Sequence, residues 1–451
     1  MGGVWLILAA GSGLTTVGPD TVTAPATTDQ ISFTGVLWEN FRTPLSILLM
    51  QIIVILAMAA LFRRLFRWLH QPPVMGEMVA GIVLGPSVLG LIFPQAMAFL
   101  FPAASLETLR LLSQIGVVLF MFVVGMEVNV KHLREKGTAA IMISHASISV
   151  PFLLGAALSL FLYRDLAPPG TSFHAFALFI GVAMSITAFP VLARILEDRG
   201  LTQTHLGAIA ITCAAVGDVT AWWILALVIA LVKATGVEIS AITIVLTLSF
   251  AGVMFFLIRP QLARVIKESD LHLKMRGLIP VILAFILASA LVTEIIGIHA
   301  LFGAFVAGVV MPPSTKFRIL LKERLEAFGS YALLPLFFVF TGLRTQIGLL
   351  TDWQDWLICA VIILVAIAGK LGGSMLMGRW TGMSWSQAFA IGTLMNTRGL
   401  VELVVLNIGY DLGILSGRIF AMMVLMALVT TFMTGPLLSL VMHRTERGGA
   451  G

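Results

Sequence analysis

Two charged side chains lie in stretches of the sequence that are otherwise apolar. Asp218 is the only charged residue between Leu206 and Val232, and Lys370 lies near the middle of the apolar run 355–379. An ionised Asp at the centre of a bilayer costs about 2.5–3.5 kcal/mol on insertion scales, so it should line a cavity or meet a partner. Such an acid can be neutralised by a proton or by a cation. The alternative is a protonated Asp218 that serves only as a structural hydrogen-bonding group.

The elements that carry these residues are predicted to be membrane-spanning helices. The chain has 451 residues, of which 59% are hydrophobic and 11% charged, whereas a soluble domain has about 25% charged residues. The apolar runs are continuous and close to the roughly 20 residues that cross a bilayer, which predicts helices rather than a barrel. We therefore expect an all-α polytopic membrane protein with about 13 transmembrane helices. The runs lie at 45–62, 74–93, 107–127, 138–163, 173–196, 204–233, 237–258, 277–296, 299–312, 329–347, 355–379, 385–409 and 417–442.

The basic residues support this division of the chain. If alternate connections are assigned to the same side, 20 of the 28 Lys and Arg residues fall on one side and six on the other, and Lys370 and Arg398 lie within spans. The side with more basic residues is expected to be cytoplasmic. This predicts a protein of the plasma (inner) membrane with the N-terminus outside and the C-terminus in the cytoplasm. The same bias explains the formal net charge of +6, so we expect no nucleic-acid partner.

An internal repeat is visible in the apolar runs. "MGEMVAGIVLGP" (75–86) is similar to "FGAFVAGVVMPP" (302–313), and "LFMFVVGM" (119–126) is similar to "LFFVFTGL" (336–343), which aligns Gly125 with Gly342. The alternative is convergence, because Val-Ala-Gly strings are common in membrane helices. The matching runs are seven crossings apart, and an odd shift inverts the orientation of the second copy. Inverted repeats are typical of secondary transporters.

The repeat predicts how the chain is divided. The expected parts are an extracytoplasmic segment (1–44), a first six-helix repeat (45–233), a linker helix (237–258), a second six-helix repeat (277–442) and a short cytoplasmic tail (443–451).

Two of the predicted helices should be interrupted. "MSITAFPVLARIL" contains Pro190 shortly after Thr187, and proline removes a backbone donor and frees a carbonyl one turn earlier. The corresponding run of the second half contains Asn396, Thr397 and Arg398 in "LMNTRGLVEL". Interrupted helices at corresponding positions of two halves are the best sequence indication of an ion site.

Three further charged residues are predicted to support the site. Arg398 and Glu402 are spaced i, i+4 and should largely neutralise each other. Glu77, at the start of the second run, is assigned either to a buried ion pair or to an ordinary interfacial position.

Several of these segments together closely resemble the monovalent cation:proton antiporter-2 family, which includes Kef-type potassium efflux systems and plant cation/H+ exchangers. The segments are "PPVMGEMVAGIVLGPSVLG", "SITAFPVLARILEDRGL", "AAVGDVTAWWILA", "PLFFVFTGLRT", "GKLGG" and "MNTRGLVELVVLNIG". The resemblance covers about residues 45–440. It implies 13 helices, a homodimer and two crossed discontinuous helices that frame an acidic site. Asp218 then matches the aspartate that binds cation and proton, and Lys370 matches a buried lysine. Gly217 departs from the pattern, because relatives commonly have Asp, Asn or Gln there.

The expected function is therefore exchange of Na+ or K+ for H+ by alternating access, with both ions competing for Asp218. Backbone carbonyls at the breaks, with Thr187, Asn396 and Thr397, would complete the cation shell, and Lys370 would be a charge partner or a second titrating group. With one acid, electroneutral exchange is the simpler expectation. The alternatives are a proton-coupled exporter of an organic cation or metabolite, and a cation or pH sensor that does not transport. Since the spans show no metal-ligand or nucleophile–histidine spacing, we expect no enzyme and no cofactor.

Overall fold

The computed structural model describes residues 37, 39–69, 71–127, 137–202, 204–233, 237–265, 271–312, 315–328 and 333–448. It divides into two compact units, Met1–Ile47 and Leu48–Gly451. The described part of the chain contains helices and no strand, which confirms the all-α prediction. The predicted N-terminal segment 1–44 lies largely outside the described residues, whereas most of the predicted tail 443–451 belongs to α23, which runs to Gly448.

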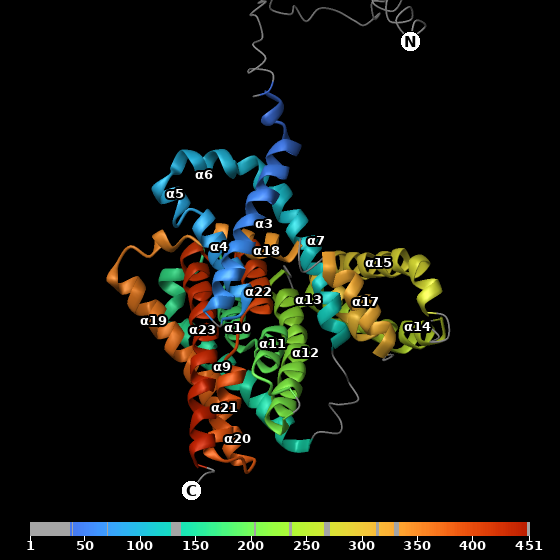
Figure 1. The fold of residues 1–451 in the computed structure, drawn as a ribbon, viewed down its shortest axis with the longest axis vertical. Helices are drawn as coiled ribbons and strands as arrows, with labels where there is room; N and C mark the ends of the chain where they lie inside the picture. Colours follow the sequence, from blue (N-terminus) through green and yellow to red (C-terminus); the bar gives the residue numbers. More distant parts are fainter. Residues whose placement is uncertain are drawn as a thin grey trace, which may run out of the picture. The chain divides into compact units, whose positions relative to one another are not determined.

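The helices of the first half are α3 (Pro44–Trp68), α4 (Pro73–Leu84), α5 (Leu89–Ile92), α6 (Pro94–Leu100), α7 (Ala103–Glu127), α9 (Gly137–Leu166), α10 (Phe173–Ser185), α11 (Phe189–Asp198) and α12 (His205–Lys233). Those that follow are α13 (Val237–Gly252), the π-helix η1 (Val253–Ile258), α14 (Arg259–Val265), α15 (Leu271–Ile296), α16 (Ala300–Val309), α17 (Thr315–Phe328), α18 (Leu334–Arg344), the 3-10 helix η4 (Ile347–Leu349), α19 (Trp353–Ile367), the π-helix η5 (Ala368–Gly372), α20 (Gly373–Trp380), α21 (Trp385–Met395), α22 (Leu400–Asp411) and α23 (Gly417–Gly448). Figure 1 shows them.

Helices long enough to cross a membrane account for most of the predicted runs. Within the described residues, nine helical spans have the length and composition of a membrane crossing, and Phe173–Ser185, Ala300–Val309 and Leu334–Leu349 are shorter apolar helices. Each of the thirteen predicted runs coincides with at least one helix. The number of thirteen crossings itself stays a prediction.

Both helices that were expected to be interrupted are broken. α10 ends at Ser185 and α11 begins at Phe189, so the first break covers Ile186, Thr187 and Ala188. Pro190 lies in the first turn of α11, where its missing N–H would have no helical partner in any case. The second break covers residues 396–399 between α21 and α22. Gly399 has a φ of 154°, a backbone conformation that residues with a side chain rarely adopt.

Two helix pairs approach closely at glycines. A Cβ built on Gly81 of α4 would lie 2.9 Å from the Cα of Gly342 in α18. A Cβ built on Gly308 of α16 would lie 2.9 Å from the Cα of Gly125 in α7. No side chain fits at either crossing, so van der Waals packing of backbone on backbone holds these helices together, as is common in membranes.

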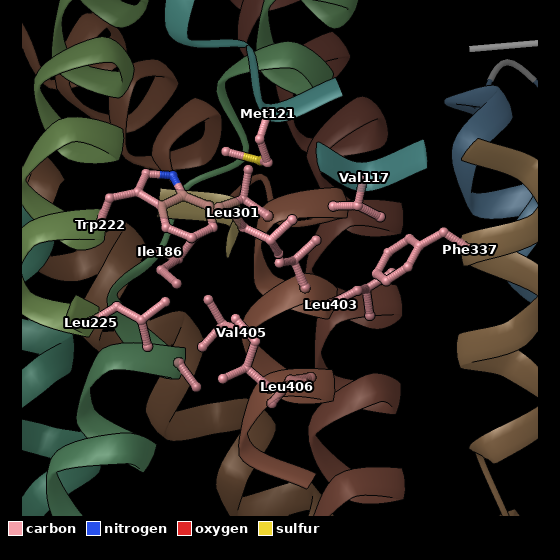
Figure 2. Packing of buried hydrophobic residues seen from close by; sticks show 14 of the residues in the cluster. Val117, Met121, Ile186, Trp222, Leu225, Leu301, Phe337, Leu403, Val405 and Leu406 are labelled. Carbon is pink, nitrogen blue, oxygen red and sulfur yellow. The ribbon is translucent and has the colours of Figure 1, made fainter. Parts of the chain in front are cut away.

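The core occupies the space between the broken helices and their neighbours. Side chains from α7, α12, α16, α18 and α22 belong to one hydrophobic cluster, and Ile186 at the first break lies in it too. In the close view of Figure 2, Trp222 and Leu225 of α12 lie near Ile186 and Leu301. The first break is therefore embedded in packed side chains.

Candidate functional site

The two broken helices meet at their breaks. The backbone N–H of Ala188 donates to the carbonyl of Thr397 at 3.1 Å, which joins one unwound segment to the other. The hydroxyl of Thr187 donates to the carbonyl of Met395, the last residue of α21, at 3.3 Å. Two segments more than 200 positions apart in the sequence thus lie side by side, as the crossed arrangement requires. Thr187, Asn396 and Thr397 are all buried at this meeting point.

Two cations cap the end of α10. The Arg398 guanidinium donates from Nη1 to the carbonyl of Ala183 at 3.0 Å and from Nη2 to that of Met184 at 2.7 Å. The Lys370 ammonium donates to the next carbonyl, that of Ser185. The last carbonyls of a helix have no partner within it and carry partial negative charge. Lys370 and Arg398 therefore stabilise a helix that ends inside the protein, in the place of water.

Lys370 is held at a distortion in its own helix. It lies in the π-helix η5, which joins α19 to α20, and it is fully buried. Its ammonium also donates to the carbonyl of Ser147 at 2.8 Å and to the Ser147 hydroxyl at 3.1 Å. Single π-turns inside α-helices are often found at functional sites. This turn was not predicted, although Gly369, Gly372 and Gly373 around Lys370 indicate an irregular helix.

Asp218 lies near the middle of α12 and is 1% exposed. α12 packs against α9, α10, α11 and α21, so it touches both broken helices. The Lys370 ammonium interacts electrostatically with Asp218 as well as with Arg398 and Glu402. Since Lys370 is hydrogen-bonded to the last residue of α10, this interaction links Asp218 to the first break. The buried acid and the buried base that the sequence singled out thus belong to one electrostatic cluster.

Neutral oxygen atoms are available at the second break. The Asn396 amide nitrogen donates to the carbonyl of Thr430 in α23 at 3.4 Å. The Asn396 Oδ1 and the Thr397 hydroxyl are buried and have no hydrogen-bond partner in the part of the chain that the structure describes. Leaving a buried polar atom unpaired typically costs about 1–3 kcal/mol. Unpaired buried oxygens at a helix break are chemically suited to bind a cation.

The remaining predicted residues form ion pairs. Arg398 and Glu402 are 3.0 Å apart and completely buried, so each compensates the charge of the other. Glu77 of α4 is paired with Arg63 of α3 at 3.2 Å and is also buried. Its ion pair joins α3 to α4 rather than either broken helix.

A second polar cluster was not anticipated. Arg344, at the end of α18, contacts Asp411 at 2.5 Å and the Asn407 amide oxygen at 3.0 Å, both on α22. Arg110 of α7 lies 3.7 Å from the other oxygen of Asp411. The Arg344 guanidinium also lies 4.9 Å from the ring centroid of Tyr410, within cation–π range. This cluster joins a broken helix to two helices of the glycine-packed pairs.

Comparison with known proteins gives one consistent result. Residues 52–444 match the family model described as "Sodium/hydrogen exchanger, transmembrane". The Na(+)/H(+) antiporter NhaS4 of Synechocystis is 44% identical over 395 residues, which cover 87% of this chain and 96% of that protein.

Cation/H(+) antiporter 17 of Arabidopsis thaliana is 42% identical over 87% of this chain, and K(+)/H(+) antiporter 1 of Saccharomyces cerevisiae is 36% identical over 91%. The chain spans about half the length of these two relatives, 48% in each case.

The solved structure of the sodium proton antiporter MjNhaP1 from Methanocaldococcus jannaschii at pH 8 has a TM-score of 0.61 and 16% identity. The likeness covers 88% of this chain and 99% of that one, so the two share a fold.

Proposed function

Because the chain belongs to the sodium/hydrogen exchanger family, we propose that it exchanges Na+ or K+ for H+ across the membrane by alternating access. The cation and the proton compete for Asp218. The observation that supports this most directly is a buried carboxylate, electrostatically coupled to Lys370, on a helix that packs against both broken helices. A single carboxylate compensates one positive charge, so Asp218 can hold either H+ or one monovalent cation at a time.

The charges of the cluster suggest the stoichiometry. Arg398 and Glu402 cancel each other, which leaves the Asp218 carboxylate and the Lys370 ammonium. Adding either H+ or a monovalent cation changes the charge of the site by one, so one-for-one exchange moves no net charge. If Lys370 released its proton when the cation binds, two protons would be exchanged for one cation and the cycle would be electrogenic. An electroneutral cycle requires Lys370 to keep its proton throughout, with its ammonium hydrogen-bonded to Ser147 and Ser185.

The cation shell would combine Asp218 with neutral oxygens from the breaks. Asn396 and Thr397 supply buried oxygens, and Thr187 lies across from them. Broken helices are where transporters place their ion sites, because unwound backbone exposes carbonyl groups and helix ends.

Alternating access also requires an equilibrium between two arrangements of the helices. The glycine-packed pairs α4–α18 and α7–α16 have interlocked backbones and form the rigid part in this proposal. The broken helices carry the ions. The cluster of Arg344, Asp411 and Arg110 joins the two parts and would stabilise one of the two arrangements.

The same glycines support the proposed inverted repeat. The repeat aligns Gly81 with Gly308 and Gly125 with Gly342. Exchanging the halves converts the contact between Gly81 and Gly342 into the contact between Gly308 and Gly125, and both contacts are present. We therefore propose 45–233 and 277–442 as the two repeats, with 237–258 as the linker. Plasma-membrane location, an outside N-terminus and a homodimer are part of the same proposal.

The test is transport by the purified protein in liposomes. A pH-sensitive dye inside the vesicles reports proton flux after addition of Na+, K+, Li+ or the organic cation choline. We expect alkali cations to drive proton movement and choline to leave it unchanged. Proton flux driven by choline alone would favour an exporter of organic cations. Cation binding without any proton flux would favour a sensor, and either result would contradict the proposal.

A further inference from the structure

The residue beside Asp218 has a feature that helix packing does not explain. Gly217 is buried in the interior of α12. Glycine in the middle of a helix is destabilising relative to alanine, because it loses more backbone freedom on folding. At Gly125, a Cβ would lie 2.1 Å from the carbonyl oxygen of Phe305, so packing excludes a side chain. At Gly217, a Cβ would meet no atom of the described residues within 4 Å, apart from its chain neighbours and its own helix backbone.

Gly217 therefore adjoins open space inside the protein. Gly217 directly precedes Asp218, and consecutive Cα atoms are about 3.8 Å apart, so this space adjoins the turn of α12 that carries Asp218. A buried space holds water when it is roomy enough and offers the water two to four polar partners. The carboxylate of Asp218 supplies such partners, and so would a cation bound to it.

We propose that Gly217 keeps room beside Asp218 for a water molecule that the transported cation retains, and that Gly217 thereby helps to determine which alkali cation is exchanged. This inference rests on the proposed function. A cation that keeps one water needs one protein oxygen fewer, which suits a site with a single carboxylate and a few neutral oxygens. A side chain at position 217 would expel the water and force fuller dehydration.

The inference predicts an order among the alkali cations. Li+ binds water more strongly than Na+, and Na+ more strongly than K+. Displacing an ordered water by a group that cannot replace its hydrogen bonds loses affinity. Gly217→Ala should therefore raise the apparent KM for Li+ and Na+ by about tenfold, and that for K+ by less. Gly217→Ser supplies a hydroxyl in place of the water and should restore part of the loss.

The experiment compares Gly217→Ala, Gly217→Ser and wild type in liposomes, with Li+, Na+ and K+ varied at one pH. Gly252→Ala is the matched control, because a Cβ on Gly252, at the end of α13, also meets no atom within 4 Å. Thermal unfolding of the detergent-solubilised variants, with and without Na+, reports folding and cation binding independently of transport. We expect Gly217→Ala to be at least as stable as wild type without cation and to gain less stability from Na+.

Two results would overturn the inference. One is that the ratios of KM among Li+, Na+ and K+ in Gly217→Ala stay within about twofold of the wild-type ratios. The other is a larger rise of KM for K+ than for Na+. If wild type itself shows no cation-driven proton flux, the proposed function fails. If wild type exchanges ions and the ratios do not move, only the role of Gly217 fails.

Discussion

The glycine-packed helix pairs and the broken-helix site use the same residue type in opposite ways. At the crossings of α4 with α18 and of α7 with α16, glycine lets two backbones touch, and any side chain would overlap its neighbour. At Gly217, the residue before the buried Asp218, glycine leaves open space. The helix pairs are stabilised by packing of backbone on backbone. In the broken-helix site, each buried charge is instead compensated by an ion pair or by hydrogen bonds. This difference suggests a rigid region and a region whose occupancy by ions can change.

The largest effect should come from Asp218 itself. Asp218→Asn keeps the size of the side chain and removes its charge, so neither H+ nor a cation is bound by charge compensation. We expect exchange to be abolished in liposomes while thermal unfolding stays close to that of wild type. Asp352→Asn, at an exposed position before α19, is the control and should exchange normally. Normal exchange by Asp218→Asn would rule out the assignment of the site.

The packed region should respond through stability. Gly125→Ala places a methyl group 2.1 Å from the carbonyl of Phe305, so α7 and α16 must move apart. Overpacking of this kind costs about 1–3 kcal/mol. We expect a lower unfolding temperature in detergent for Gly125→Ala and none of this loss for Gly217→Ala. Equal unfolding temperatures of Gly125→Ala and Gly217→Ala would contradict the view that glycine is required for close packing at position 125 and not at position 217.

Substitution of Lys370 tests whether the hydrogen bonds that it donates at the end of α10 are needed for stability and for exchange. Lys370→Ala leaves the carbonyls of Ser185 and Ser147 without their donor inside the protein. Each unpaired buried group costs about 1–3 kcal/mol, so we expect reduced stability together with an altered pH dependence of exchange. Lys370→Met, which keeps most of the volume, separates loss of charge from loss of packing. Unchanged stability and an unchanged pH profile would make Lys370 part of the scaffold only.

Gly217→Asp adds a second carboxylate where the structure has room for it. The added acid brings a second titrating group to the site, so exchange should begin to carry net charge. We expect its rate to depend on an imposed membrane potential, while the wild-type rate does not. The measurement is proton flux in vesicles at several clamped potentials, with Gly217→Asn as the uncharged control. A rate independent of potential in Gly217→Asp would contradict this prediction.

The smallest effect is expected at the cluster that joins the two regions. Asp411→Asn weakens the ion pair with Arg344, and such partly exposed pairs contribute about 0.2–1 kcal/mol. This corresponds to at most about a fivefold shift in the equilibrium between two arrangements. We expect a modest change in exchange rate that shrinks at high ionic strength. Glu107→Gln is the control, because Glu107 hydrogen-bonds to Arg110 within α7. A fall in unfolding temperature as large as that of Gly125→Ala would contradict the proposal that this cluster stabilises one of the two arrangements.

Much of the architecture was predictable because its causes are local. The length of an apolar run decides whether it can span a bilayer, so the helices were found where the sequence placed them. Pro190 restricts its own backbone, and the polar residues 396–398 interrupt an apolar run, which is why both breaks were anticipated. The pairing of Arg398 with Glu402 also follows from their i, i+4 spacing in the sequence.

The contacts that define the site have a different origin. Lys370 is bonded to residues 223 and 185 positions away, and Arg398 to residues 214 and 215 positions away. The i, i+4 rule says nothing about such distances, so the capping of α10 by two cations was not foreseen. The same holds for Glu77, whose partner Arg63 lies on another helix, and for the cluster around Arg344.

The sequence by itself determined that Asp218 and Lys370 lie deep within membrane-spanning helices and that two of those helices break, because depth and breakage follow from neighbouring residues. Only the tertiary structure decided that the breaks touch, that Lys370 holds the end of α10, and that Gly217 faces open space while Gly125 does not. Those facts depend on which backbone passes close by, and residues far apart in the chain determine that.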